Sequence, residues 1–203
     1  GVPPVVSPPQ PRAGGPPEAP GGRRALAQRT PPIREARHVR GLWDGIAQGV
    51  ADVIGSDPAP HTLEEKARPY PASPSGMPGV QTLLPVMLDH VAKGRLSLER
   101  LVDLTSAGAQ RVFQIAGKGR MAEGWDGDLT LVDLKARRVL RHADMATRSG
   151  WTPFDGMEVE GYPAGTIVRG RVVMRDGELM GRAIHGGTHK PVEKLSEFIV
   201  VSR

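Results

Sequence analysis

The most regular feature of the chain is a stripe of apolar residues between positions 80 and 91. Its members recur at intervals of three and four residues: Val80, Leu83, Leu84, Met87, Leu88 and Val91. This spacing predicts an α-helix, because residues about 3.6 positions apart lie on the same helix face. We expect Pro85 to lie near the first turn or to bend the helix, and Gly94 to end it.

Weaker helical patterns flank this stripe. Residues 33–49 carry apolar side chains roughly on one face, and Ser97 can cap a further helix through about Thr105. A third helix is predicted over residues 107–116. The segment 62–79 is rich in proline, serine and glycine, which predicts a loop. This half of the chain is therefore predicted to be mainly helical.

The apolar residues follow a different period after residue 118. Residues 129–134 and 166–169 predict β-strands. Residues 172–180 predict a hairpin, because Asp176-Gly177 suits the type I′ turn between antiparallel strands. The helices are therefore followed by a small β module.

The short run at residues 50–56 is predicted to be a buried parallel strand, because it is rich in β-branched residues and Asp57 follows it. In α/β barrels the C-terminal ends of such strands carry the catalytic residues. Two prolines stiffen the next loop, in which His61 follows Asp57 by four positions. The two side chains could transfer protons. Alternatively, Asp57 caps a turn and His61 is a surface or packing residue.

The first 30 residues differ from the rest of the chain in composition. They are rich in proline, glycine and alanine, and four arginines against one glutamate give a charge balance of +3 out of the net +5. Such a segment cannot bury enough apolar surface to offset its ordering entropy, so we expect a disordered tail. A polyproline ligand is the alternative. We expect no nucleic-acid partner, because no aromatic residue accompanies this basic charge.

The chain contains no cysteine, which excludes disulfides and thiolate metal sites. It has no apolar run long enough to span a membrane and no apolar stretch typical of a signal peptide. We therefore expect a cytoplasmic protein without a membrane partner. His185 and His189 lie in a glycine-rich segment that disfavours a helix, so we expect a flexible tail there and not a metal site.

Four motifs follow one another along the chain. They are Pro31-Pro32-Ile33-Arg34, Asp57-Pro58-Ala59-Pro60-His61-Thr62, Ser75-Gly76-Met77-Pro78-Gly79-Val80-Gln81-Thr82 and Thr152-Pro153-Phe154-Asp155-Gly156. In this order they closely resemble the C-terminal part of bacterial dihydroorotases of the cyclic amidohydrolase superfamily. The resemblance runs from about residue 31 to about residue 181 and covers less than half of a typical family member.

The resemblance implies an α/β fold, namely the C-terminal fragment of a metal-dependent hydrolase (β/α)8 barrel with part of a small β-sandwich. It divides the chain into a disordered tail (1–30), the last barrel strand with its helices (31–117), a small β module (118–182) and a flexible tail (183–203). An eight-stranded barrel cannot close with one strand, so we expect the fragment to fold incompletely, associate or aggregate.

The resemblance also implies a reaction. Dihydroorotases interconvert dihydroorotate and carbamoyl aspartate in pyrimidine synthesis, and a metal-activated hydroxide attacks the ring carbonyl. Asp57 matches the catalytic aspartate that takes the hydroxide's proton and can also contact the metal. His61 matches a residue that helps to bind the substrate carboxylate. Pro78 and Gly79 match a loop whose backbone hydrogen-bonds the substrate ring, and glycine allows a close approach.

The chain departs from the family pattern in its metal ligands. The family holds zinc mainly with a His-x-His pair, two later histidines and commonly a carboxylated lysine, and this chain has no pair of that spacing. Zinc needs about three or four protein ligands. Thr30 stands where members often carry a substrate-binding asparagine, and Pro58 stands where many carry histidine. We therefore expect this chain alone not to retain zinc.

Three functions stay open. The first is a dihydroorotase-like hydrolase of a small cyclic ureide, incomplete as this chain alone and acting with a complementing fragment or as a homo-oligomer. The alternative within the enzyme class is a hydantoinase or allantoinase, because the same barrel end serves other cyclic ureides. The third is a non-catalytic remnant or interaction module.

Overall fold

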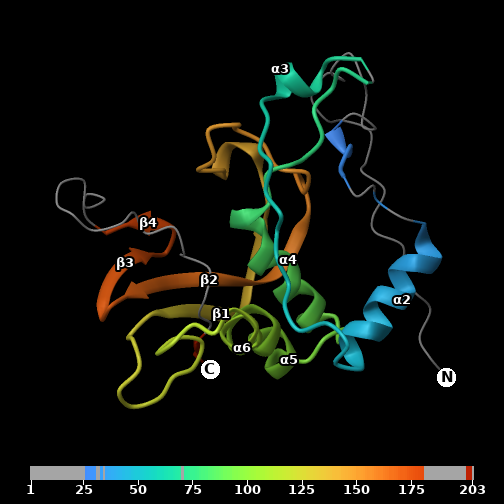
Figure 1. The fold of residues 1–203 in the computed structure, drawn as a ribbon. Helices are drawn as coiled ribbons and strands as arrows, with labels where there is room; N and C mark the ends of the chain where they lie inside the picture. The colour runs from blue at the N-terminus through green and yellow to red at the C-terminus, as the bar shows by residue number, and fades with distance from the viewer. Residues whose placement is uncertain (1–25, 31–32, 34, 70, 181–199, 203) are drawn as a thin grey trace.

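The computed structural model describes residues 26–30, 33, 35–69, 71–180 and 200–202 (Figure 1). The predictions about the proline-rich tail before residue 26, and about His185 and His189, lie outside these residues. Within the described part of the chain, no helix is both long enough and apolar enough to cross a membrane.

The main helices lie between residues 36 and 113. They are α2 (Ala36–Ala47), α3 (Leu63–Lys66), α4 (Val80–Ala92), α5 (Leu98–Val102), the π-helical η1 (Asp103–Ala107) and α6 (Gly108–Phe113), and the 3-10 turn η2 (His142–Asp144) follows later. The apolar stripe is confirmed as α4, and Pro85 is buried within that helix. Gly94 has a φ of +68° just beyond its end, the left-handed conformation that commonly terminates a helix.

The segment after α4 follows its prediction only in part. Ser97 caps α5 as expected, because its Oγ accepts a hydrogen bond from Arg100 N at 3.1 Å. The α-helix ends at Val102, however, and continues as the π-helical turn η1. Helix α6 ends at Phe113, because Gln114 has a left-handed conformation with a φ of +53°.

Among the described residues, five strands form one sheet in the order β4-β3-β2-β1-β5. They are β1 (Leu129–Val139), β2 (Glu158–Val168), β3 (Arg171–Arg175), β4 (Glu178–Leu179) and β5 (Val200–Ser202). Strands β1 to β4 pair antiparallel, whereas β5 runs parallel to β1. The strand predicted at 129–134 is confirmed within β1, and that at 166–169 lies at the end of β2. Positive φ angles at Asp176 and Gly177 fit the predicted type I′ turn.

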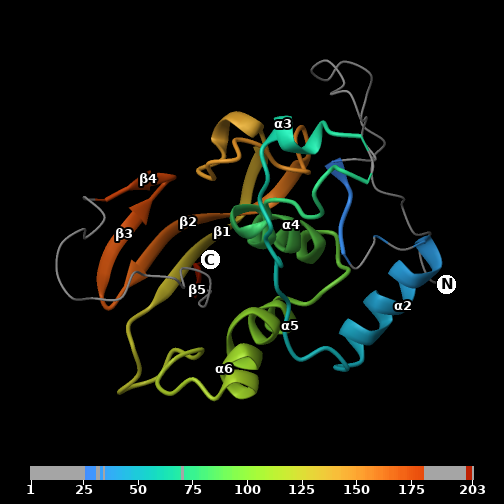
Figure 2. The ribbon, with the colours of Figure 1, turned by 45° about the horizontal axis from the view of Figure 1, so that its top comes forward.

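Helix α4 packs against β2 at the centre of the molecule (Figures 1 and 2). The buried apolar residues of the core come from α4, the segment after it, and β1: Met87, Leu88, Leu96, Leu101, Leu104 and Val132. Gly161 in β2 permits this close packing, because a Cβ there would lie 2.8 Å from the Cβ of Leu88. The α4–β2 contact is thus the apolar frame on which the remaining segments lie.

Residues 50–62 cross this frame in an extended conformation, running past α4 from the end of α2 to the start of α3 (Figures 1 and 2). The predicted strand at 50–56 is wrong for this structure. Ile54 N donates to Leu104 O at 3.0 Å, on the segment after α5. A strand needs a neighbouring strand to complete its backbone hydrogen bonds. Among the described residues, no strand lies beside this segment.

The predicted loop at 62–79 contains the short helix α3. Its N-terminus is a capping box, in which Glu65 N donates to Thr62 Oγ1 at 3.2 Å and Thr62 N donates to Glu65 Oε2 at 2.9 Å. These reciprocal bonds satisfy two amide groups that a helix start leaves free. The loop prediction is therefore wrong over these four residues.

Candidate functional site

Asp57 lies at a sharp corner where the extended segment turns towards α3. Its φ is +42°, a left-handed conformation that aspartate tolerates better than most residues do. Arg29 Nη2 donates to Asp57 O at 3.1 Å and to Asp57 Oδ2 at 3.3 Å. The Asp57 side chain is nevertheless 81% exposed. The corner therefore presents a carboxylate to solvent with a guanidinium group beside it.

The backbone of residues 76–79 packs against this corner. Ala59 N donates to Met77 O at 3.3 Å. Gly76 has a φ of +121°, and a Cβ there would lie 2.6 Å from Ala59 O. At Gly79, the N-cap of α4, a Cβ would lie 3.3 Å from the Cβ of Ser56. The structure thus brings the Met77-Pro78-Gly79 turn next to Asp57, and glycine permits both close approaches.

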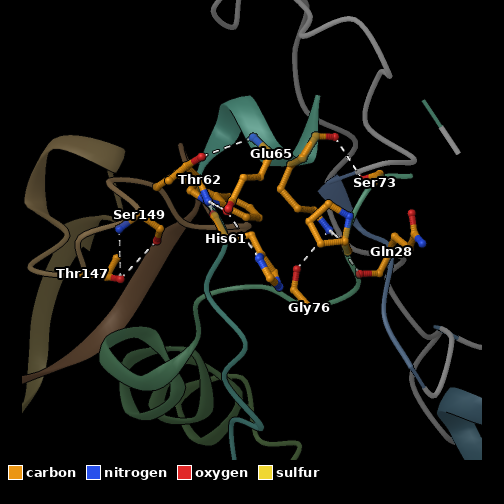
Figure 3. Close-up of polar contacts among 11 residues, drawn as sticks. Gln28, His61, Thr62, Glu65, Ser73, Gly76, Thr147 and Ser149 are labelled. Carbon is orange, nitrogen blue, oxygen red and sulfur yellow. Dashed lines mark hydrogen bonds and ion pairs between the residues drawn. The ribbon is translucent and has the colours of Figure 1, made fainter. Parts of the chain in front are cut away.

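His61 lies farther along the same loop, beside α3 (Figure 3). Its Nδ1 is 3.4 Å from Glu65 Oε2, and its carbonyl oxygen accepts a hydrogen bond from Trp151 Nε1 at 2.7 Å. The hydrogen bond from Thr62 N, together with the neighbouring His61, holds the pKa of Glu65 below its usual value, although partial desolvation opposes this. The described contacts of His61 are therefore with α3 and Trp151 and not with Asp57.

The motif at residues 152–156 closes a turn that supports Trp151. Gly156 N donates to Leu140 O at 2.7 Å, and Asp155 Oδ1 accepts a hydrogen bond from His142 N at 2.7 Å. Trp151 itself is 1% exposed. These contacts give the motif a structural role, which is to hold the indole that anchors the backbone at His61.

The structure adds two cations to the residues that the sequence singled out. Arg29 contacts Asp57, and Lys66 is buried among backbone carbonyl oxygens of the neighbouring segments. Arg29 had no sequence signal, because its partner lies 28 positions away. The Thr62–Glu65 capping pattern could have revealed α3, which carries Lys66, but it gives no indication of what surrounds that side chain.

The described residues do not by themselves fit a zinc ion. Among them, no three histidine, aspartate or glutamate side chains lie close enough together to hold a metal. Asp57 Oδ2 is within 3.3 Å of the cationic Arg29, which would compete with a metal for the same oxygen. Zinc sites need about three or four protein ligands. The metal-ligand role of Asp57, and the expectation that this chain alone does not retain zinc, therefore stay predictions.

A helical segment on an antiparallel sheet, with an aspartate corner packed against a glycine-containing turn, corresponds to one part of a known hydrolase class. Residues 29–173 match the model of the Amidohydrolase family, and the chain belongs to that family. The resemblance to the amidohydrolase family is thereby confirmed, whereas the bacterial origin and the truncation of the chain stay predictions.

Relatives within the family carry the name dihydroorotase. One from Methanothermobacter thermautotrophicus is 38% identical over 172 residues, which cover 81% of this chain and 39% of the relative. One from Halobacterium salinarum is 43% identical over 148 residues, covering 73% of this chain and 35% of the relative. The chain thus spans less than two fifths of the length of these relatives.

Similar solved structures include hydantoinases. An L-hydantoinase (dihydropyrimidinase) from Arthrobacter aurescens has a TM-score of 0.73 and 34% identity, covering 78% of this chain and 37% of that chain. A D-hydantoinase (dihydropyrimidinase) from Thermus sp. has a TM-score of 0.70 and 30% identity, covering 78% of this chain and 36% of that chain. The fold of this chain therefore corresponds to one part of these longer enzymes.

Proposed function

We propose that this chain supplies the C-terminal part of a dihydroorotase-like cyclic amidohydrolase, which interconverts dihydroorotate and carbamoyl aspartate. The observation that carries the proposal is the packing of residues 76–79 on residues 56–59, because it brings two of the four motifs together beside one exposed carboxylate. The identity of 35–43% to relatives of that name supports the choice of substrate.

In this proposal Asp57 is the proton acceptor. Its exposed carboxylate takes a proton from the water that attacks the ring carbonyl, and returns it to the ring nitrogen as the amide bond breaks. The reverse transfers close the ring of carbamoyl aspartate. The left-handed corner and the contact of Arg29 with the Asp57 carbonyl fix the direction of this side chain.

The neighbouring groups bind the substrate in this proposal. The turn at Pro78 and Gly79 offers backbone groups to the ring, and Gly79 allows the approach because it has no side chain. His61 binds the substrate carboxylate. The bond between Trp151 Nε1 and the His61 carbonyl, together with the contact between the imidazole and Glu65, limits where this imidazole can lie.

The remaining three fifths of the relatives' length, joined to this chain or supplied separately, would complete the site. We propose that residues 50–56 then become the last strand of a (β/α)8 barrel, since they are already extended and no strand occupies either side among the described residues. Strands β1–β4 would form part of the adjoining β-sandwich. Because no three candidate ligands lie together among the described residues, the zinc ligands other than Asp57 would come from the added part. The proposed enzyme is cytoplasmic and acts on a small cyclic ureide, either with a complementing fragment or as a homo-oligomer.

A hydantoinase activity is the second candidate, and the TM-scores of 0.73 and 0.70 to hydantoinases favour it. The two can be separated by assaying the completed enzyme with dihydroorotate, hydantoin, dihydrouracil and allantoin. We expect turnover of dihydroorotate to exceed that of the other rings. Preferred turnover of an uncharged ring would instead support the hydantoinase, and no turnover of any ring would support the non-catalytic remnant.

A further inference from the structure

Lys66 is fully buried at the end of α3, with 0% exposure. Its Nζ donates hydrogen bonds to three backbone carbonyl oxygens: Pro74 O at 2.8 Å, Gly76 O at 3.0 Å and Gln28 O at 3.4 Å. Three acceptors match the three N–H donors of an ammonium group. Burial lowers the pKa of this lysine. Placing a cation in the interior costs free energy unless its environment compensates, so the three carbonyl groups must supply that compensation.

The three carbonyl groups belong to the two segments that meet at Asp57. Gln28 directly precedes Arg29, the residue that contacts the Asp57 carboxylate. Pro74 and Gly76 begin the loop that packs against the Asp57 corner and leads to Gly79. Figure 3 shows Gln28 and Gly76 beside each other below α3.

The same two segments are also bonded to one another. Gly76 N donates to Gln28 O at 2.9 Å, and the hydroxyl groups of Thr30 and Ser75 lie 3.1 Å apart. Gln28 O therefore accepts hydrogen bonds from both Gly76 and Lys66. The ammonium group lies at the point where the two segments are joined, and it connects both of them to α3.

We propose that Lys66 is a positioning residue of the active site, whose ammonium group holds residues 28–30 and the loop at 74–79 together and thereby fixes Arg29 and the loop backbone around Asp57. Its consequence for catalysis rests on the proposed function, whereas the positioning itself is a property of this chain. Methionine has a similar length but no donor, so Lys66→Met would leave the three carbonyl groups, of which that of Gly76 is buried, without this partner.

Hydrogen exchange of the full chain tests the positioning. The amides of Ala59 and Gly76 are reporters, because each donates to a carbonyl oxygen of the joined segments. We expect Lys66→Met to accelerate their exchange about tenfold or more, while the Leu140 amide, which bonds to Met157 O, is unchanged. Lys135→Met, at an exposed lysine on β1, is the matched control. Equal exchange rates in the two variants would overturn the proposal.

Chemical rescue separates the role of the charge from that of the side-chain volume. Because the chain has no cysteine, Lys66→Cys introduces a unique thiol. Alkylation of the unfolded variant with 2-bromoethylamine recreates a lysine-like ammonium, whereas bromoethane adds the same chain without the amine. After refolding, we expect only the aminoethylated protein to recover slow exchange at Ala59 and Gly76. Equal exchange in the two alkylated proteins would contradict the inference.

Kinetics of the completed enzyme test the catalytic consequence. With dihydroorotate as substrate, we expect Lys66→Met to raise KM and to lower kcat/KM at least tenfold relative to Lys135→Met. Identical kinetics in the two variants would overturn the positioning role. If the wild-type enzyme itself does not turn over dihydroorotate, the proposed function fails, and the exchange experiments still decide the role of Lys66.

Discussion

The α4–β2 core and the corner around Asp57 are stabilised in different ways. In the core, Leu88, Leu101 and Val132 are at most 1% exposed and make apolar contacts. At the corner the Asp57 carboxylate is largely exposed, and the chain segments are joined by hydrogen bonds from Arg29 and Lys66 to backbone oxygens. The core therefore depends on buried area, and the corner depends on a few directional bonds.

This difference has a consequence for stability. A buried leucine contributes several kcal/mol, whereas a single hydrogen bond contributes a net of about 0.5–1.5 kcal/mol. Regions held by few bonds open more often than apolar cores do. We therefore expect the Asp57 corner to open locally without unfolding of the α4–β2 core. The variants below are ordered from the largest expected effect to the smallest.

Leu88→Ala removes apolar contacts from the α4–β2 core. Because Leu88 is 1% exposed and faces β2, truncation should lower the free energy of unfolding by about 2–5 kcal/mol in chemical denaturation. Leu179→Ala, at a leucine that is 80% exposed, is the control and should stay within about 0.5 kcal/mol of the wild type. Equal effects of the two variants would show that the core is misassigned.

Gly76→Ala adds a methyl group where the loop packs against the corner around Asp57. A methyl group there would lie 2.6 Å from Ala59 O in a left-handed conformation, so we expect a local cost of about 1–3 kcal/mol. Hydrogen exchange of the Ala59 amide should accelerate while exchange in α4 is unchanged. Gly117→Ala is the control, because Gly117 has a φ of +70° and open space around it. Acceleration in α4 as well would show that the corner and the core open together.

Asp128 gives the sheet a dependence on pH. Partial burial would raise the pKa of Asp128, but hydrogen bonds from Lys118 and from Arg169 N outweigh it, so the pKa lies below its usual value. A carboxyl group with a lowered pKa in the folded state stabilises the fold above its unfolded pKa near 3.8 and loses this contribution as pH falls through its folded pKa.

Asp128→Asn should accordingly flatten the loss of stability on acidification below about pH 4, and should cost about 1 kcal/mol near neutral pH. Thermal denaturation across this pH range is the measurement. Asp44→Asn, at an exposed residue of α2, should keep the wild-type profile. If Asp128→Asn also keeps it, Asp128 is not the source of the acid sensitivity.

Thr62→Ala should have the smallest effect. It removes the hydroxyl that caps α3 at Glu65 N, at a cost of about 1 kcal/mol confined to this helix. Faster exchange of the Glu65 amide is the expected result, and Thr62→Ser should preserve slow exchange because serine supplies the same acceptor. Unchanged exchange of the Glu65 amide in Thr62→Ala would mean that the Thr62 hydroxyl does not stabilise the start of α3.

The sequence predicted the core far better than the corner. The stripe from Val80 to Val91 specifies α4 by its period alone, and the Asp-Gly pair specifies the hairpin turn, because both signals are local. Whether residues 50–56 form a strand cannot be decided from the local sequence, because a strand needs a neighbouring strand as its hydrogen-bond partner.

The polar network at the corner had no local signal. Lys66 and Gln28 are 38 positions apart, and the acceptors are backbone groups that every residue carries. The motif resemblance identified Asp57, Pro78 and Gly79 as neighbours in function, and the loop that carries Pro78 and Gly79 contacts Ser56 and Ala59, on either side of Asp57. It gave no indication that His61 contacts Glu65 or that Arg29 pairs with Asp57.

Substitution of Asp57 tests the central claim most directly. Asp176→Asn is the matched control, because Asp176 is also an exposed aspartate in a left-handed conformation, with a φ of +50°, but lies in the β3–β4 hairpin. In the completed enzyme, Asp57→Asn should lower kcat for the interconversion of dihydroorotate and carbamoyl aspartate by about 100-fold to 10,000-fold, since an amide cannot accept the proton. Asp176→Asn should leave it unchanged. An Asp57→Asn enzyme with wild-type turnover would contradict the account.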